Sequence, residues 1–200
     1  DVFGDFCIEF IENASKKLKP FCLYFAPNAP HEPATPADED KFLSIDLPEF
    51  PPNFNEENIS DKPNWLQVKE PLLSDEAVHE INEFRNDQLL SLRSLDRNIE
   101  RIIQILEEEK LLDKTVVIFL SDNGKLWGEH RMISKNSFYE EASRVPFALR
   151  YPPLVPTPYI EEKPVSNIDI APTLYDLARI PTPKEVDGVS LVPLLLAGDM

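Results

Sequence analysis

Hydrophobic side chains recur at helical spacing in three parts of the chain. The longest pattern covers residues 74–110, where apolar residues return every three or four positions. Ser74 is suited to cap the N-terminus of this helix. A second stripe covers residues 2–17, and a third covers residues 167–178, with Pro172 in its first turn. These patterns predict three amphipathic helices, each with one face toward a core.

Three short apolar runs predict β-strands. They cover residues 21–26, 115–121 and 145–151, and Pro146 favours a sheet edge for the last because proline cannot donate a ladder hydrogen bond. Short helical turns are expected at residues 138–142 and 190–196. Helices that alternate with buried strands predict an α/β fold, with a mixed sheet flanked by helices.

The stretch from residue 27 to residue 73 has no hydrophobic period and is dense in Pro, Asn, Asp and Glu. A loop of this length is uncommon in a compact domain unless it has a function. We interpret it as a substrate-side loop that carries His31 near its start. Prolines on both sides of His31 restrict the backbone, which lowers the entropy lost when the imidazole is held in one direction.

Composition limits the classes of function. The 200 residues include 20 basic and 36 acidic side chains, a net charge of −16, which argues against nucleic acid as a partner. A polyanionic substrate would need a local basic pocket that outweighs this global charge. No apolar run approaches the roughly 18 residues of a membrane-spanning helix. Cys7 and Cys22 lack metal-ligand spacing, and we expect both in the core.

The first residues have no basic region of the kind that opens a signal peptide. They are typical of the interior of a longer chain, and we expect the first residues to lie within a helix. The 200 residues could form one large domain or part of a bigger one.

Candidate chemistry begins where the strand at 115–121 ends, at Asp122, Asn123 and Gly124. A carboxylate and an amide oxygen are ligands that a hard cation such as Ca²⁺ or Mg²⁺ prefers, and glycine allows a sharp turn behind them. Asp-Asn-Gly is also ordinary turn chemistry. The position after a buried strand favours the metal, because ligands of α/β sheets bind outside the carboxyl ends of strands.

His130 and Lys135 follow the Asp-Asn-Gly turn in the sequence. A metal, a proton carrier and a fixed positive charge are the parts needed to cleave an ester of an oxyanion. Each residue also has an ordinary interpretation: His130 could be a solvent-facing loop histidine, and most lysines are surface residues. His79 lies on the long helix, where we expect it to be exposed.

Four motifs in this order resemble the type I sulfatases of the alkaline phosphatase superfamily. They are Ala26-Pro-Asn-Ala-Pro-His-Glu-Pro33, Ser121-Asp-Asn-Gly124, Gly128-Glu-His130 with Lys135, and Tyr139-Glu-Glu141 with Arg144-Val-Pro146. The segments at residues 54–65 and 84–86 are similar to the branch that contains N-acetylglucosamine-6-sulfatases and arylsulfatases. Departures are Ser134, where a glycine usually precedes the lysine, and Lys125-Leu126, where that branch has a tyrosine-histidine pair.

The resemblance implies an alkaline-phosphatase-like sulfatase fold, of which residues 1–200 would be the second half of the catalytic domain. It implies that Asp122 and Asn123 are Ca²⁺ ligands, with Mg²⁺ as an alternative. Lys135 would hold a sulfate oxygen, and His31 would contact the sulfate or the leaving oxygen. His130 matches the Gly-Glu-His motif and is expected to be catalytic, with a less defined role.

The nucleophile of this family is a formylglycine made from a Cys/Ser-x-Pro/Ala-x-Arg motif, and neither Cys7 nor Cys22 stands in one. The Asp-Asp pair that completes the metal site in the family is also not found here. We expect both upstream, in an N-terminal half of the domain, and expect this fragment alone to be inactive.

The sequence therefore predicts hydrolysis of sulfate esters, on a sulfated sugar or glycosaminoglycan of the 6-O-sulfated glucosamine type or on an aryl sulfate. One alternative is a phosphodiesterase or phosphomonoesterase of the same superfamily. Another is a non-catalytic module that binds sulfated glycans. The resemblance also implies an extracytoplasmic location.

Overall fold

The structure, a computed structural model, describes residues 2–17, 19–69 and 71–197. The chain divides into two compact units. The first contains residues 1–111 and 123–145, and the second contains residues 112–122 and 146–200.

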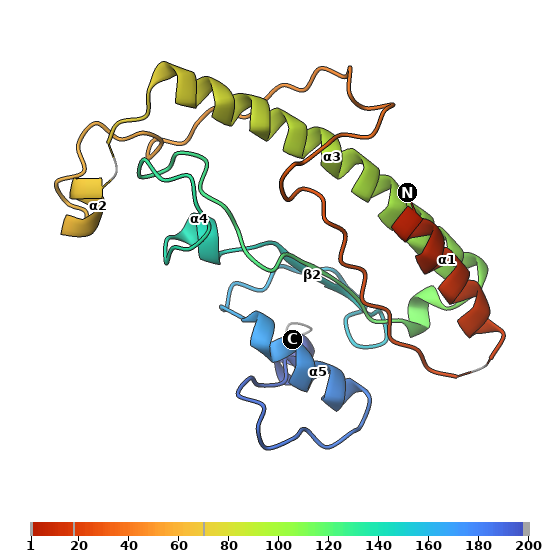
Figure 1. The fold of residues 1–200 in the computed structure, drawn as a ribbon. Coiled ribbons are helices and arrows are strands. Elements are labelled where there is room, and N and C mark those ends of the chain that lie inside the picture. The colour runs from red at the N-terminus through yellow and green to blue at the C-terminus, as the bar shows by residue number, and fades with distance from the viewer. Residues whose placement is uncertain (1, 18, 70, 198–200) are drawn as a thin grey trace. The chain divides into compact units, whose positions relative to one another are not determined.

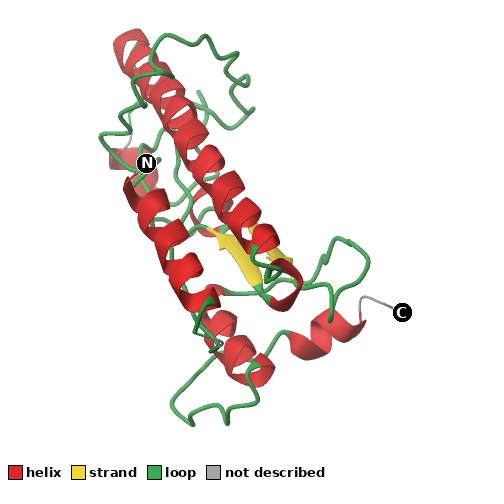
Figure 2. Cartoon of the chain, turned by 90° about the vertical axis from the view of Figure 1, so that its right-hand side faces the viewer, coloured by secondary structure: helices red, strands yellow, loops and turns green. Residues whose placement is uncertain are grey.

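A long helix, α3 (Asp75–Glu108), organises the first unit, and α1 (Val2–Ser15) lies along it (Figures 1 and 2). The Ser74 hydroxyl accepts a hydrogen bond from the Ala77 amide at 3.2 Å, the predicted cap at the N-terminus of α3. Gly4 allows α1 to lie close to α3, because a Cβ at this position would lie 1.9 Å from the Oδ1 atom of Asn98 on α3. The helices predicted for residues 2–17 and 74–110 are confirmed.

The two cysteines differ in environment. Cys7 is buried on α1, and burial raises the pKa of its thiol. Cys22 is exposed, so the expectation of two core cysteines is wrong for this residue.

The segment at residues 21–26 forms no regular secondary structure, so the predicted buried strand is wrong. Its side chains still alternate, with Cys22 exposed and Tyr24 86% exposed on one side and half-buried residues on the other. A strand becomes regular when its backbone pairs with a neighbour. Both strands of the described chain, β1 and β2, pair with each other.

The long loop predicted at residues 27–73 is irregular apart from one short helix, α2 (Asn64–Lys69). Side chains of α3 hold it by hydrogen bonds: Arg85 donates to the Pro48 carbonyl at 2.7 Å and Gln88 to the Pro30 carbonyl at 2.9 Å. A small core cluster includes side chains of this segment. Its members are Ile59, Leu66, Leu126, Met132 and Ala142, with Tyr139 packed against them. Ala142 belongs to α4 (Glu140–Ser143), which confirms the predicted helical turn.

The second unit contains the two-stranded antiparallel sheet, β1 (Val117–Leu120) and β2 (Phe147–Arg150). Both strands were predicted, at slightly greater length. A one-turn helix, η1 (Leu112–Lys114), precedes β1, and Arg150 donates hydrogen bonds to the Leu112 carbonyl and the Asp113 carboxylate.

The same unit ends in helices η2 (Asn167–Asp169), α5 (Ile170–Leu177) and α6 (Val192–Ala197). Asp169 connects them, because its carboxylate accepts hydrogen bonds from the Ser166 and Val189 amides at 2.9 Å each. The helices predicted for residues 167–178 and 190–196 are confirmed. No described helix combines the length and apolarity needed to cross a membrane.

Asp40 anchors the long loop to α3 and gives the first testable prediction. Its side chain is 3% exposed, and its carboxylate accepts hydrogen bonds from Arg97 at 2.6 and 3.1 Å and from Arg93 at 3.0 Å. The hydrogen bond from Arg97 is the main reason that the pKa of Asp40 lies below its ordinary value. A lowered pKa in the folded state stabilises the fold above the ordinary value, and this contribution is lost as pH falls through the lowered value.

We expect Asp40→Asn to lower the free energy of unfolding at pH 7. The difference from wild type should shrink in acid, where the wild-type carboxylate also becomes neutral. Urea unfolding of both proteins between pH 7 and pH 3 would measure this, with the exposed Asp46→Asn as the control. If Asp40→Asn lowered the free energy of unfolding by the same amount at every pH, the lowered pKa assigned to Asp40 would be contradicted.

Candidate functional site

His31 and Lys135 lie side by side in the first unit, although 104 positions separate them in sequence. The Lys135 Nζ atom is 3.3 Å from the His31 Nε2 atom, and both side chains are exposed. The long loop supplies the imidazole, and the segment before α4 supplies the ammonium group. The structure thus brings together two of the residues predicted from motifs far apart in the chain.

The contacts of His31 indicate which ring nitrogen carries the proton. Its Nδ1 atom lies 3.1 Å from the Glu32 carbonyl oxygen, which can only accept, so Nδ1 is the donor. In the neutral imidazole, Nε2 is then an acceptor, and it faces the ammonium group of Lys135. An oxyanion that enters here would meet the Lys135 ammonium group, and His31 would offer a second donor when Nε2 is protonated as well.

Backbone and buried side-chain contacts fix the position of His31. Its amide donates to the Asn28 carbonyl at 2.8 Å, and its carbonyl accepts from the Ala34 amide at 2.8 Å. Gln88, buried on α3, donates to the Pro30 carbonyl and accepts from the Trp127 indole at 2.7 Å. Gln88 therefore connects the loop of His31 to the segment that leads to Lys135.

A second lysine, Lys125, contacts the residue that follows His31. The Lys125 Nζ atom is 3.6 Å from the Glu32 carboxylate and 5.3 Å from the centre of the Phe84 ring. The sequence marked Lys125 only as a departure from a motif.

The predicted metal ligands stand where β1 ends, and the division between the two units falls between Asp122 and Asn123. Asp122 is exposed, and the Asn123 side-chain amide donates to the Gly124 carbonyl at 2.9 Å. Gly124 is required for close packing rather than for a left-handed turn. A Cβ at this position would lie 2.0 Å from the Glu141 carbonyl oxygen.

The donor chemistry of Asp122 and Asn123 suits Ca²⁺ or Mg²⁺, since both side chains offer hard oxygens. Two side chains cannot fill a Ca²⁺ shell, which takes about six to eight oxygens. Among the described residues, no group of three or more His, Cys, Asp or Glu side chains could hold a metal ion. Asp122 and Asn123 could supply at most part of a metal site, and their assignment as ligands stays a prediction.

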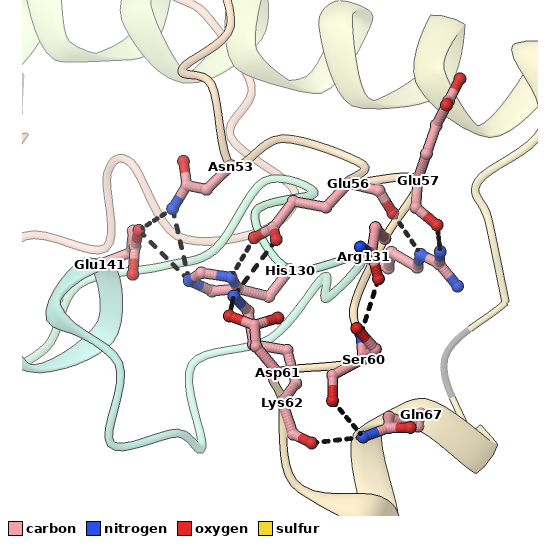
Figure 3. Close-up of polar contacts among 11 residues, drawn as sticks. Asn53, Glu56, Glu57, Ser60, Asp61, Lys62, Gln67, His130, Arg131 and Glu141 are labelled. Carbon is pink, nitrogen blue, oxygen red and sulfur yellow. Dashed lines mark hydrogen bonds and ion pairs between the residues drawn. The ribbon is translucent and has the colours of Figure 1, made fainter.

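His130 is only 8% exposed, which rules out a solvent-facing loop histidine. Its Nδ1 atom is 2.6 Å from the Glu56 carboxylate, and its Nε2 atom is 3.3 Å from the Asn53 side-chain amide (Figure 3). Its ring also stacks on Tyr139, with 4.1 Å between the ring centres. Among the described residues, His130 makes no hydrogen bond, ion pair or ring stacking with His31 or Lys135.

Several residues around the site were not predicted from the sequence. Gln88 could have been found, because a polar residue on the apolar stripe of α3 needs a buried partner. Asn53 and Glu56 gave no signal, since they stand in a polar stretch without a period. His79 is exposed as predicted, 3.5 Å from Glu83.

Comparisons with known proteins agree with the motifs. A family model described as Sulfatase matches residues 1–180. The extracellular sulfatase SULF-1 homolog of Drosophila melanogaster is 32% identical over 203 residues, covering 98% of this chain and 18% of the relative. The N-acetylglucosamine-6-sulfatase of Homo sapiens is 31% identical over 201 residues, covering 98% of this chain and 35% of the relative.

A solved structure, described as a complex with its substrate D-glucosamine-2-N,6-O-disulfate, matches with a TM-score of 0.72 and 25% identity. The match covers 98% of this chain and 51% of the solved chain. The predicted α/β fold, with this chain supplying part of it, is therefore confirmed. The chain spans less than half the length of these two curated relatives.

Proposed function

Because this chain belongs to the sulfatase family, we propose that the complete protein hydrolyses sulfate esters and that His31 and Lys135 act on the sulfate group. The 3.3 Å approach of Nζ to Nε2 carries this proposal, because it joins a fixed cation and an imidazole at one exposed point. Cleavage of a sulfate ester shifts charge on the sulfuryl oxygens and builds charge on the leaving alkoxide. Lys135 would stabilise the oxygens, and His31, protonated at Nε2, would give its proton to the alkoxide.

We propose that Asp122 and Asn123 contribute oxygens to a divalent cation, which would polarise the sulfuryl oxygens when bound. The support is the pair of hard oxygens in consecutive residues after β1. The formylglycine nucleophile is proposed to come from residues outside this chain. Cys7 is unsuited to that role because it is buried on α1 and outside the required motif.

Loss of one ligand should be measurable without turnover. We expect Asp122→Ala to raise the Kd for Ca²⁺ at least about tenfold, since even outer contacts of metal ligands contribute 10–100-fold. Titration calorimetry of the metal-free complete protein would measure it, with the exposed Asp46→Ala as the control. Equal affinity in both variants would remove Asp122 from the ligand set.

The proposed substrate is a sulfated sugar of the 6-O-sulfated glucosamine type, with aryl sulfates as further substrates. The names of the human relative and of the solved complex both concern sulfated glucosamine. Lys135 would provide positive charge for such an anion. Since the Drosophila relative is named an extracellular sulfatase, we propose an extracytoplasmic location.

Sulfate release tests the function. The complete protein should liberate sulfate from glucosamine 6-sulfate, whereas residues 1–200 alone should not. Hydrolysis of a phosphate diester to an alcohol and a monoester, or release of phosphate from a monoester, with no sulfate release, would favour the phosphoesterase alternative. Binding of a sulfated glycan without any release would favour the non-catalytic module.

A further inference from the structure

The segment that carries Lys135 is a closed loop, here named the Lys135 loop, formed by residues 126–135. Two backbone hydrogen bonds close it, from the Gly128 amide to the Met132 carbonyl at 2.9 Å and from the Leu126 amide to the Ser134 carbonyl at 2.8 Å. His130 lies at the tip, and Lys135 follows the last closing contact. A change at the tip can therefore reach Lys135 through a short, hydrogen-bonded path.

The backbone of the tip is held against the long loop. The His130 amide donates to the Asn53 carbonyl at 2.8 Å, and the Asn55 amide donates to the Gly128 carbonyl at 2.8 Å. The Arg131 guanidinium group donates to the carbonyls of Glu56 and Glu57 at 2.8 Å each (Figure 3). These contacts fix the tip on residues 53–57.

The side chain of His130 adds a second layer, here named the His130 network: Asn53, Glu56, His130 and Glu141. Nδ1 donates to the Glu56 carboxylate, which leaves Nε2 as an acceptor for the Asn53 amide. The same Asn53 amide donates to the Glu141 carboxylate at 2.6 Å. Lys62 lies 3.2 Å from the other Glu56 oxygen, so this half-buried carboxylate is paired on both sides.

The network joins three segments: the long loop through Asn53 and Glu56, the Lys135 loop through His130, and α4 through Glu141. His130 also has a left-handed backbone, with φ of 54°. A histidine tolerates this conformation better than most residues, but still at a cost. A buried, strained and fully paired imidazole with no hydrogen bond to His31 among the described residues is suited to holding a loop rather than to exchanging protons with a substrate.

We propose that His130 is a positioning residue: the His130 network holds the Lys135 loop so that the Lys135 ammonium group stays beside His31. This inference rests on the proposed function for its kinetic consequence, but not for its structural one. It assigns to His130 a task different from the catalytic role expected from its motif.

The structural consequence is measured by NMR of the histidine rings in the complete protein. The ring signals of His31 are identified by their loss in His31→Ala. His130→Phe keeps an aromatic ring on Tyr139 but removes both ring nitrogens, so we expect it to move the His31 signals. His130→Asn should restore them, because asparagine tolerates a left-handed backbone and its amide can donate to Glu56. The matched control, His79→Asn on the exposed face of α3, should leave them unchanged.

The kinetic consequence is non-additivity with Lys135. We expect His130→Phe to lower kcat/KM for a sulfate ester at least about tenfold, and His130→Asn to recover most of this loss. In the Lys135→Ala background, His130→Phe should add little further loss, because a residue that acts through Lys135 has nothing left to position. If the fold-loss of kcat/KM in the double variant equalled the product of the two single-variant losses, the proposal would be contradicted.

The two readouts separate the failure of each claim. If wild type releases no sulfate, the proposed function fails, while the NMR signals of His31 still decide whether His130 positions Lys135. Unchanged His31 signals in a folded His130→Phe variant would overturn the positioning role. If that variant does not fold, Asn53→Ala removes the bonds to His130 and Glu141, and unchanged His31 signals there would overturn it equally.

Discussion

Replacing Lys135 with alanine should lower kcat/KM of the complete protein for a sulfate ester by about 10²–10³-fold. This is the usual cost of removing one donor aimed at a developing oxyanion. The loss should fall mainly on kcat, because the ammonium group matters most when charge moves on the sulfuryl oxygens. Initial rates of sulfate release across substrate concentrations would measure both constants.

The exposed Lys184→Ala is a matched control for Lys135→Ala, since it removes the same charge elsewhere in the chain. It should leave both constants within twofold of wild type. Lys135→Arg keeps the charge but changes its geometry, and we expect intermediate activity. If Lys135→Ala behaved like the Lys184 control, Lys135 would not contact the sulfate.

His31→Ala should lower kcat/KM by about 10²–10⁴-fold on a sugar sulfate, the range of general acid–base catalysis. The loss should be smaller on an aryl sulfate, because a phenolate is a weaker base than a sugar alkoxide and needs less protonation as it leaves. The ratio of the two losses therefore reports the role of His31 as an acid. Parallel assays of wild type and variant on both substrates would measure it.

His79→Ala provides the control, because this histidine is exposed on α3 and away from Lys135 in its contacts. We expect wild-type rates on both substrates. Equal losses of His31→Ala on the sugar and aryl substrates would contradict proton donation by His31. They would leave it a role in binding sulfate.

Hydrophobic periodicity predicted the long helices, because the spacing of apolar residues within each helix shows which face is buried. The helix at 74–110 appears as α3 with its Ser74 cap, and the strands after it pair within the chain. The strand expected at 21–26 failed for a physical reason. Its apolar side chains show only which residues prefer burial, whereas regular strand structure also needs a backbone neighbour.

The site was predicted unevenly. The motifs around His31 and Lys135 led to the resemblance with sulfatases, which the family model confirms. They could not give the contact between the two residues, which depends on how two distant loops pack. They also gave no role for Asn53 and Glu56, because a polar residue in a loop becomes informative only when its buried partner is known.

The most direct test of the central claim is a crystal structure of the complete protein with a sulfated sugar or sulfate bound. We predict sulfate oxygens within about 2.7–3.2 Å of both the Lys135 Nζ atom and the His31 Nε2 atom. A sulfate bound in the reacting site with neither residue in contact would contradict the claim that this pair acts on the sulfate group.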